Sequence, residues 1–169
     1  MNQTTYIRSF ASSEWQTYKE LRLRALADSP DAFSRTLAEE QTRSDEEWAK
    51  RLERGATSGW DLPLLVEVNG EPAGLAWGYI EATNPEVAHL YQVWVAPNYR
   101  GLGVGKMLLD AIISWAKEKK AEYLELGVTQ ADSPAINLYV RAGFKPTGKV
   151  EPLRPGSELL CQNMQLKLR

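Results

Sequence analysis

The chain has 169 residues, of which 25% are charged and 43% hydrophobic, and its formal net charge is -2. This composition is that of an ordinary globular protein, and we expect one compact domain over residues 1–169. The small negative charge leaves no excess of Lys and Arg to neutralise phosphates, so we expect no nucleic-acid partner.

Other classes of chemistry are limited by what the sequence lacks. The first ten residues contain no apolar signal segment, and no apolar run approaches the roughly 18 residues that span a bilayer, so we expect a cytoplasmic protein without a membrane partner. Cys161 is the single cysteine and His89 the single histidine. An internal disulfide and a paired-cysteine zinc site are therefore excluded, and we expect no metal.

The N-terminal quarter predicts a strand and two helices. Residues 4–10 alternate in the manner of a short strand. Ser13 followed by Gln16 predicts the capping box of a first helix, and Ser44 followed by Glu47 predicts that of a second. Both segments that follow carry apolar residues at helical spacing.

A three-stranded antiparallel meander follows. Residues 62–82 indicate two strands joined at Asn69 and Gly70, a dipeptide suited to positive φ in a tight hairpin turn. Residues 87–96 indicate a third strand, which Pro97 closes.

The next segment runs from this strand through a glycine-rich turn into an amphipathic helix. Gly101, Gly103 and Gly105 alternate in the turn, and glycines there let successive backbone N–H groups approach an anion at the positive end of the helix dipole. An ordinary strand-to-helix turn is the alternative. A Walker A loop would need glycine at Arg100, and a dinucleotide fingerprint would need glycine at Lys106. ATP or GTP hydrolysis and nicotinamide chemistry are therefore disfavoured.

The C-terminal third completes an α/β architecture. Residues 122–128 predict a strand that is parallel to its predecessor if the helix is a crossover. Residues 133–144 predict a short helix with Ser133 as its N-cap, and two further strands follow. We expect a mixed sheet of about six or seven strands flanked by four helices.

Two motifs resemble signatures of the GNAT superfamily of N-acetyltransferases. The hexapeptide RGLGVG, Arg100 to Gly105, is similar to the R/Q-x-x-G-x-G/A pyrophosphate loop, and the strand before it resembles the fourth strand of that family. Residues 133–144, SPAINLYVRAGF, resemble its second signature. The resemblance implies a single GNAT-type domain whose mostly antiparallel sheet has a central splayed parallel pair.

The resemblance also implies acetyl-CoA as the donor substrate, with no metal. Backbone N–H groups of the loop would hold its pyrophosphate, and the strand before the loop would bind the pantetheine arm. The residues implied to bind the cofactor are Val93, Trp94, Val95, Arg100, Gly101, Leu102, Gly103, Val104, Gly105, Lys106 and Asn137.

Tyr139 resembles the general acid of the family, which protonates the departing thiolate. A phenol with a pKa of about 10 is suited to this, since the conjugate acid of a thiolate has a pKa near 8.5. Tyr139 as a core aromatic is the alternative. The candidate bases are His89, whose ordinary pKa of about 6.5 suits proton transfer near neutrality, and Glu81. A packed histidine, a solvated carboxylate and a water chain remain open.

The expected activity is direct transfer of an acetyl group to a primary amine of a small molecule, peptide or protein. Cys161 lies far in sequence from the cofactor signatures, which argues against an acetyl-enzyme. The alternative is a non-catalytic acyl-CoA-binding or sensing module on the same fold. Whether two copies pair as a homodimer is left open by the sequence.

Candidate acceptor residues are aromatic and acidic. Even-odd counting places Trp77 with Tyr79 on one face of their strand and Tyr91 with Val93 on one face of the next, where either an acceptor pocket or core packing would use them. Glu39 and Glu40 would attract a cationic amine, with a solvated helix end as the alternative.

Overall fold

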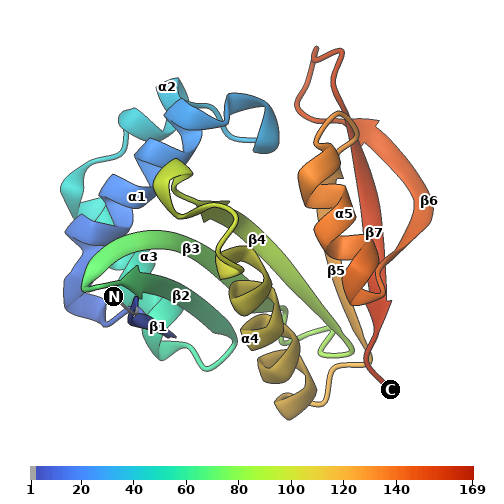
Figure 1. The fold of residues 1–169 in the computed structure, drawn as a ribbon, viewed down its shortest axis with the longest axis horizontal. Helices are drawn as coiled ribbons and strands as arrows, with labels where there is room; N and C mark the ends of the chain where they lie inside the picture. Colours follow the sequence, from blue (N-terminus) through green and yellow to red (C-terminus); the bar gives the residue numbers. More distant parts are fainter. Residues whose placement is uncertain (1–2) are drawn as a thin grey trace.

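The computed structural model describes residues 3–169, which form a seven-stranded sheet in the order β1-β2-β3-β4-β5-β7-β6 (Figure 1). The strands are β1 Thr5–Ser9, β2 Asp61–Val68, β3 Glu71–Ile80, β4 Val87–Val95, β5 Tyr123–Thr129, β6 Lys145–Pro152 and β7 Leu160–Lys167. The helices are α1 Trp15–Asp28, α2 Leu37–Gln41, α3 Asp45–Thr57, α4 Val104–Glu118 and α5 Ser133–Ala142.

The fold class is confirmed. Neighbouring strands are antiparallel except for β4 and β5, which are parallel and joined by the crossover helix α4. The turn between β2 and β3 has positive φ at Asn69 (52°) and Gly70 (81°), as their sequence predicts. The short helix α2 is an addition to the four expected helices.

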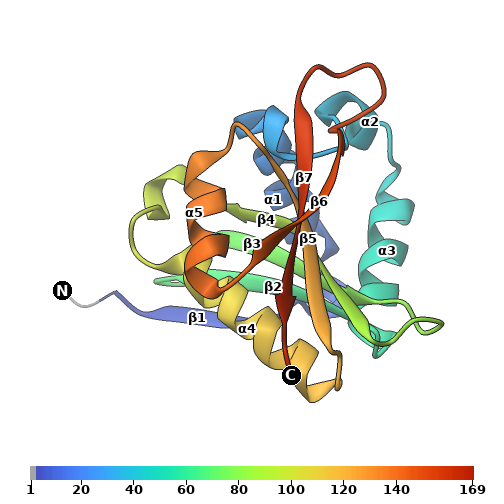
Figure 2. The same ribbon diagram turned by 90° about the vertical axis from the view of Figure 1, so that its right-hand side faces the viewer.

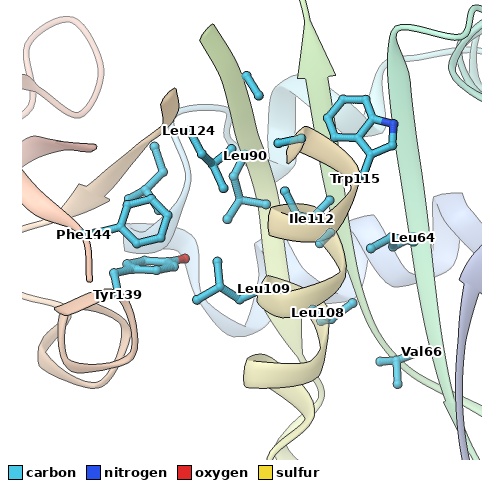
Figure 3. Packing of buried hydrophobic residues seen from close by; sticks show 14 of the residues in the cluster. Leu64, Val66, Leu90, Leu108, Leu109, Ile112, Trp115, Leu124, Tyr139 and Phe144 are labelled. Atoms are coloured by element: carbon cyan, nitrogen blue, oxygen red, sulfur yellow. The ribbon is translucent and has the colours of Figure 1, made fainter. Parts of the chain in front are cut away.

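Two hydrophobic cores lie on opposite faces of the sheet. The first is formed with α4 and α5, and Figure 3 shows Leu108 and Ile112 of α4 directed toward the strands. The second is formed with α1 and α3 around Tyr18, Trp48 and Leu52, each 0% exposed. Figure 2 shows α4 and α3 on opposite sides of the sheet. The apolar side of each helix therefore faces the sheet. This packing also fixes the positions of the connecting loops.

A bulge in β4 corrects one expectation. Gln92 has a φ of 60°, and the pairing of β3 with β4 shifts so that Trp77 faces Tyr91 while Leu75 faces Trp94. The extra residue reverses the alternation, so Tyr91 lies on the face of the α1–α3 core and Val93 packs on the α4 face. The expectation that Tyr91 and Val93 share a face is therefore wrong.

The parallel pair at the centre of the sheet is short. Only Val87 to His89 pair with Tyr123 to Glu125 in the described strands, and beyond these residues β4 and β5 diverge. This is the central splayed pair that the sequence led us to expect. None of the helices formed by the described residues is both long and apolar enough to cross a membrane.

Two predicted helix caps are wrong. The N-cap of α1 is Glu14, one residue after Ser13, and no side chain among the described residues caps this helix. Glu14 instead accepts from the backbone N–H of Ala11 at 2.8 Å and so closes the 3-10 turn before α1. The N-cap of α5 is Asp132, whose carboxylate accepts from the N–H of Ala135 at 3.3 Å. An acidic side chain thus caps α5, whereas α1 begins without a side-chain cap among the described residues. The Ser44 cap of α3 is confirmed.

Candidate active site

A cavity of about 880 Å³ opens where β4 and β5 diverge. Its walls come from α1, α3, β3, β4, β5 and α5, from the connection between α1 and α2, and from the loop between β6 and β7. Of the residues expected to act on the cofactor or in catalysis, Val93 and Tyr139 line it. The volume is within the range of about 300–1,000 Å³ that small-molecule sites occupy.

The glycine loop that follows β4 has the conformation that glycine permits. Gly101 and Gly103 have φ values of 80° and 79°, and Gly103 is the N-cap of α4. Within residues 3–169, no side chain caps this helix, so the N–H groups of its first turn are available to an anion. Gly105 lies inside that first turn, and a Cβ there would meet Leu138 at an ordinary 3.5 Å. Its necessity for ligand approach stays a prediction.

Arg100 is exposed, and its guanidinium is bound within the protein rather than free. Its Nε donates to the carbonyl of Val95 at 2.9 Å, and its Nη2 pairs with Asp28 at the end of α1. Asp28 also accepts from Trp94 Nε1 at 3.0 Å. Hydrogen bonds from Trp94, Ser29 and Arg100 lower the pKa of Asp28 to about 2. Arg100 thus ties the loop to α1, and its contact with a phosphate stays a prediction.

Tyr139 projects from α5 into the interior. It is 7% exposed and packs edge-on against Phe144, with ring centroids 5.7 Å apart. Figure 3 shows its oxygen directed toward α4. Burial, with a smaller contribution from Asp132, raises its pKa well above the ordinary value, so the phenol keeps its proton throughout the neutral range. Tyr139 therefore has both a packing role and a position at the cavity wall.

His89 and Glu81 lie on the edge of this site. His89 is half-buried on β4, where it stacks on Tyr91 with ring centroids 5.9 Å apart. Burial lowers its pKa, and the charges of Glu125 and Glu81 oppose that shift. Glu81 is exposed just beyond β3. Tyr79 and Tyr91 line the cavity but these two candidate bases do not.

Besides the exposed loop residues 100–103, Lys106 and Asn137 of the implied cofactor set are also exposed and lie outside the cavity wall. Lys106 forms an ion pair with Asp110 at 2.7 Å on the surface of α4. Asn137 is exposed on α5, two residues before Tyr139. A larger ligand that extends from the cavity over the start of α4 would reach such surface positions, and their roles stay predictions.

The end of the cavity beside α1 and α3 has arginines where the sequence suggested acids. Glu40 is 0% exposed, and its Oε2 accepts from Arg43 Nε at 2.6 Å and Arg51 Nη1 at 3.3 Å. Glu39 faces Arg35 at 3.5 Å. The expectation that Glu39 and Glu40 attract a cationic amine is not supported by this arrangement, because neither carboxylate lines the cavity and both are paired.

Cys161 is closer to the site than its place in the sequence suggests. β7 lies beside β5, with Cys161 opposite Thr129, and Cys161 lines the cavity. Remoteness is therefore no argument against an acetyl-cysteine. Burial, together with the charge of Glu151, raises the pKa of the thiol, which keeps the nucleophilic thiolate scarce at neutral pH.

Arg154, in the loop between β6 and β7, binds the connection between α1 and α2, part of which lines the cavity. Its guanidinium donates to the carbonyls of Pro30 and Phe33 at 2.9 Å and to that of Ser34 at 3.3 Å. The hydroxyl of Thr129 at the end of β5 donates to the carbonyl of Asp31 at 2.6 Å. These bonds join the α1–α2 connection to the far half of the sheet.

Sequence reasoning missed three residues that shape the site. Arg22 occupies the buried face of α1 between Leu21 and Ala25, and its position four residues after Tyr18 was a detectable signal. The hydroxyl of Tyr18 donates to Gln92 Oε1 at 2.8 Å and so holds the bulge in β4. No local pattern marks Gln92, because a bulge depends on pairing with β3.

Among residues 3–169, no group of three or more His, Cys, Asp or Glu side chains is placed to hold a metal ion.

The model of the acetyltransferase (GNAT) family matches residues 15–144 of the chain. The chain is also similar to solved structures over almost its whole length. One is a putative acetyltransferase from Salmonella typhimurium with its cofactor acetyl-CoA, with a TM-score of 0.81 and 22% identity over 98% of this chain and 95% of that one.

Curated relatives match the chain over shorter segments. An N-alpha-acetyltransferase from Sulfurisphaera tokodaii is 37% identical over 92 residues, which are 48% of this chain and 55% of that protein. A streptothricin acetyltransferase from Streptomyces lavendulae is 35% identical over 94 residues, which are 56% of this chain and 49% of that protein. The chain thus matches about half the length of each of these relatives.

Proposed function

The chain belongs to the acetyltransferase (GNAT) family, and we propose that it is a single-domain, acetyl-CoA-dependent N-acetyltransferase over residues 1–169. One observation carries the proposal. A cavity at the divergence of β4 and β5 reaches Tyr139, and an uncapped helix N-terminus led by two positive-φ glycines follows β4. The amine acceptor is a separate question, since the two curated relatives are named for acceptors of different kinds.

The residues at the cavity fit acetyl-CoA. N–H groups at the start of α4 suit its pyrophosphate, because they point out of an uncapped helix end and the dipole adds positive charge. Among the described residues, the edge of β4 beyond His89 has no strand partner on the β5 side, so backbone groups near Val93 are available to an amide-bearing arm. When bound, acetyl-CoA supplies the activated acetyl group as a thioester.

Tyr139 is the proposed general acid. The raised pKa of Tyr139 keeps its proton in place at neutral pH, but it also makes the phenol a weaker donor. The same apolar wall raises the proton affinity of a thiolate placed there, so donor and acceptor shift in the same direction. The amine must lose a proton, and His89, Glu81 or a water chain is the proposed route.

Transfer is proposed to be direct, without an acetyl-cysteine. The support is the raised pKa of Cys161, which leaves little thiolate to attack a thioester. Cys161→Ala should therefore retain turnover, measured by thiol release. Mass spectrometry that finds an acetyl group on Cys161 during turnover would contradict direct transfer.

The test of the function is thiol release from acetyl-CoA in the presence of a library of amines, amino acids, peptide N-termini and polyamines. The expected result is acceptor-dependent release with acetylation of the acceptor nitrogen. Tight binding of acetyl-CoA without release from any acceptor would favour a non-catalytic acyl-CoA-binding module. Failure to bind acetyl-CoA at all would contradict both the acetyltransferase and the acyl-CoA-binding module.

A further inference from the structure

The acceptor end of the cavity is rich in guanidinium groups. Four arginines contribute to the wall: Arg22 from α1, Arg35 from the α1–α2 connection, and Arg51 and Arg54 from α3. The carboxylates among the described lining residues are Asp61 and Asp132. Asp61 accepts from Trp77 Nε1 at 2.8 Å and Asp132 caps α5, so both are already engaged. The net charge of the wall is positive.

Arg22 is the central group of this cluster. It is 3% exposed, and its guanidinium lies over the ring of Phe33 at 4.7 Å from the centroid. Among the described residues, no acceptor is within hydrogen-bond reach of its Nε and Nη1. A buried guanidinium without acceptors is costly, because each unmet N–H has lost its hydration. Arg22 therefore lines the cavity wall, and two of its buried nitrogens have no acceptor among the described residues.

The neighbouring carboxylate compensates Arg22 only in part. Burial lowers the pKa of Arg22 and the charge of Glu40 opposes that shift, but Glu40 Oε1, like Arg22 Nε and Nη1, has no hydrogen-bond partner among the described residues. Glu40 is the buried carboxylate of this region, and its Oε2 is bound to Arg43 and Arg51. No ion pair within 4 Å joins Glu40 to Arg22 among the described side chains. Three guanidinium groups thus surround one carboxylate, and an additional anion would complete the set.

From this arrangement we infer that the acceptor is a primary amine that also carries an anionic oxygen group, a carboxylate or a phosphate, which binds Arg22 and Arg51. This inference rests on the proposed function and names its substrate class. The guanidinium fork is matched to two oxygens of either group. A polycationic amine is disfavoured at the same wall, because its other charges would face arginines.

The acceptor test compares matched amines in the thiol-release assay. L-Phenylalanine is compared with its amide and with 2-phenylethylamine, and glucosamine 6-phosphate with glucosamine. We expect the anionic member of at least one set to have a KM at least about 10-fold lower, which corresponds to one charge-assisted hydrogen-bond pair. The two sets distinguish a carboxylate from a phosphate. Equal KM values within both sets would overturn the inference while leaving the acetyltransferase function intact.

Variants locate the anion site. Arg22→Gln should raise KM for the anionic acceptor about 10- to 100-fold, with a much smaller change in kcat, and should not alter KM for the neutral analogue. Arg22→Lys should recover only part of the loss, because an ammonium lacks the fork. Lys50→Gln is the control, since Lys50 is on α3 but is exposed and pairs with Glu46 at 2.9 Å. Equal losses for anionic and neutral acceptors would overturn the assignment.

Arg22 is buried, so its replacement risks unfolding, which circular dichroism would detect. Arg54→Gln provides the second variant, because Arg54 is exposed at the rim of the cavity. It should raise KM for the anionic acceptor by about 2- to 5-fold, as expected for an exposed charge pair. No change with Arg54→Gln, together with an unfolded Arg22→Gln, would count against the inference.

A binding measurement separates this inference from the proposed function. N-Acetyl-L-phenylalanine and its amide are each titrated into the protein, and binding is followed by tryptophan fluorescence, since Trp60 and Trp77 line the cavity. The carboxylate should bind the parent more tightly than the amide, and Arg54→Gln should weaken the carboxylate alone. This readout needs no turnover. Equal binding of acid and amide would overturn the anion site even if no acceptor were acetylated.

Discussion

The end of the site formed by β4 and the glycine loop is built within one continuous stretch of chain, whereas the end beside α1 and α3 is assembled from separate segments. The first end offers main-chain groups of β4 and of the glycine loop, between residues 87 and 106. The second offers side chains, four of them arginines, from α1, the α1–α2 connection and α3. The difference predicts that the first end is sensitive to backbone shape and the second to charge.

The largest effect should come from the residue between the two ends. Tyr139→Phe keeps the ring and its contact with Phe144 but removes the hydroxyl. Turnover should fall on the order of 10²-fold while affinity for acetyl-CoA barely changes, as expected for the loss of a general acid. Steady-state kinetics measures both. Tyr6→Phe, at an exposed position on β1, is the control, and parental turnover in Tyr139→Phe would remove the proposed acid.

The backbone-dependent end is tested by Gly103→Val. The φ of 79° at Gly103 is unfavourable for a β-branched residue, and the added side chain lies where a phosphate would approach. The dissociation constant for acetyl-CoA should rise about 30-fold, because the variant loop relaxes in the free protein and must regain the strained φ on binding, at roughly 1–3 kcal/mol. Isothermal titration calorimetry measures it.

Two glycine controls separate strain from ligand contact. Gly148 has a φ of 88° but lies on β6, so Gly148→Val should cost stability and leave the affinity unchanged. Gly105→Ala adds a Cβ that the protein accommodates, so a loss of affinity there would report ligand approach. Unchanged affinity in both Gly103→Val and Gly105→Ala would show that the loop does not bind the donor.

The link between the two ends should have a smaller effect. Asp28, on α1, binds Trp94 and Arg100, and its pKa of about 2 lies below its ordinary 3.8. A depressed pKa contributes stability that is present above about pH 4 and is lost as the pH falls toward 2. Asp28→Asn should lower the free energy of unfolding at pH 7 by about 1 kcal/mol, after allowance for solvent screening.

Urea denaturation at several pH values tests this link. The gap in unfolding free energy between parent and Asp28→Asn should narrow between pH 4 and pH 2. Asp110→Asn breaks an exposed pair on α4 and should change stability very little. A gap that is constant with pH would mean that the ionised form of Asp28 is not what stabilises the link.

The smallest expected effect is a change in the shape of the pH–rate profile. If His89 is the base, the acidic limb of the kcat/KM profile has its midpoint below about 6.5, because burial lowers the pKa of His89. His89→Gln should flatten that limb, with Glu81→Gln as the matched control. A limb that persists in His89→Gln would direct attention to Glu81 or to a water chain.

The sequence was most informative where structure depends on neighbouring residues. Asn69 and Gly70 specify their own turn, and the glycines of the loop specify a positive φ that no later packing overrides. The motif that contains Tyr139 likewise lies within one helix and the two residues that follow it.

Long-range pairing explains what the sequence could not predict. The bulge at Gln92 arises from the register of β3 against β4 and from the distant Tyr18. Arg22 has the residue type of a surface position, and its burial follows from how α1 lies against the α1–α2 connection. Cys161 approaches the cavity because β7 pairs with β5. None of these contacts leaves a periodic pattern in the chain.

Arg154 has a mechanical consequence. The sheet has two halves, β1–β4 and β5–β7. They are joined at one end by the short pairing of Val87–His89 with Tyr123–Glu125. At the other end, three hydrogen bonds from Arg154 and one from Thr129 attach the second half to the α1–α2 connection. Because the gap between β4 and β5 is bridged at both its narrow and its wide end, its width should stay fixed. The binding of one ligand would then leave the halves in place for the other, so neither substrate would have to enter first.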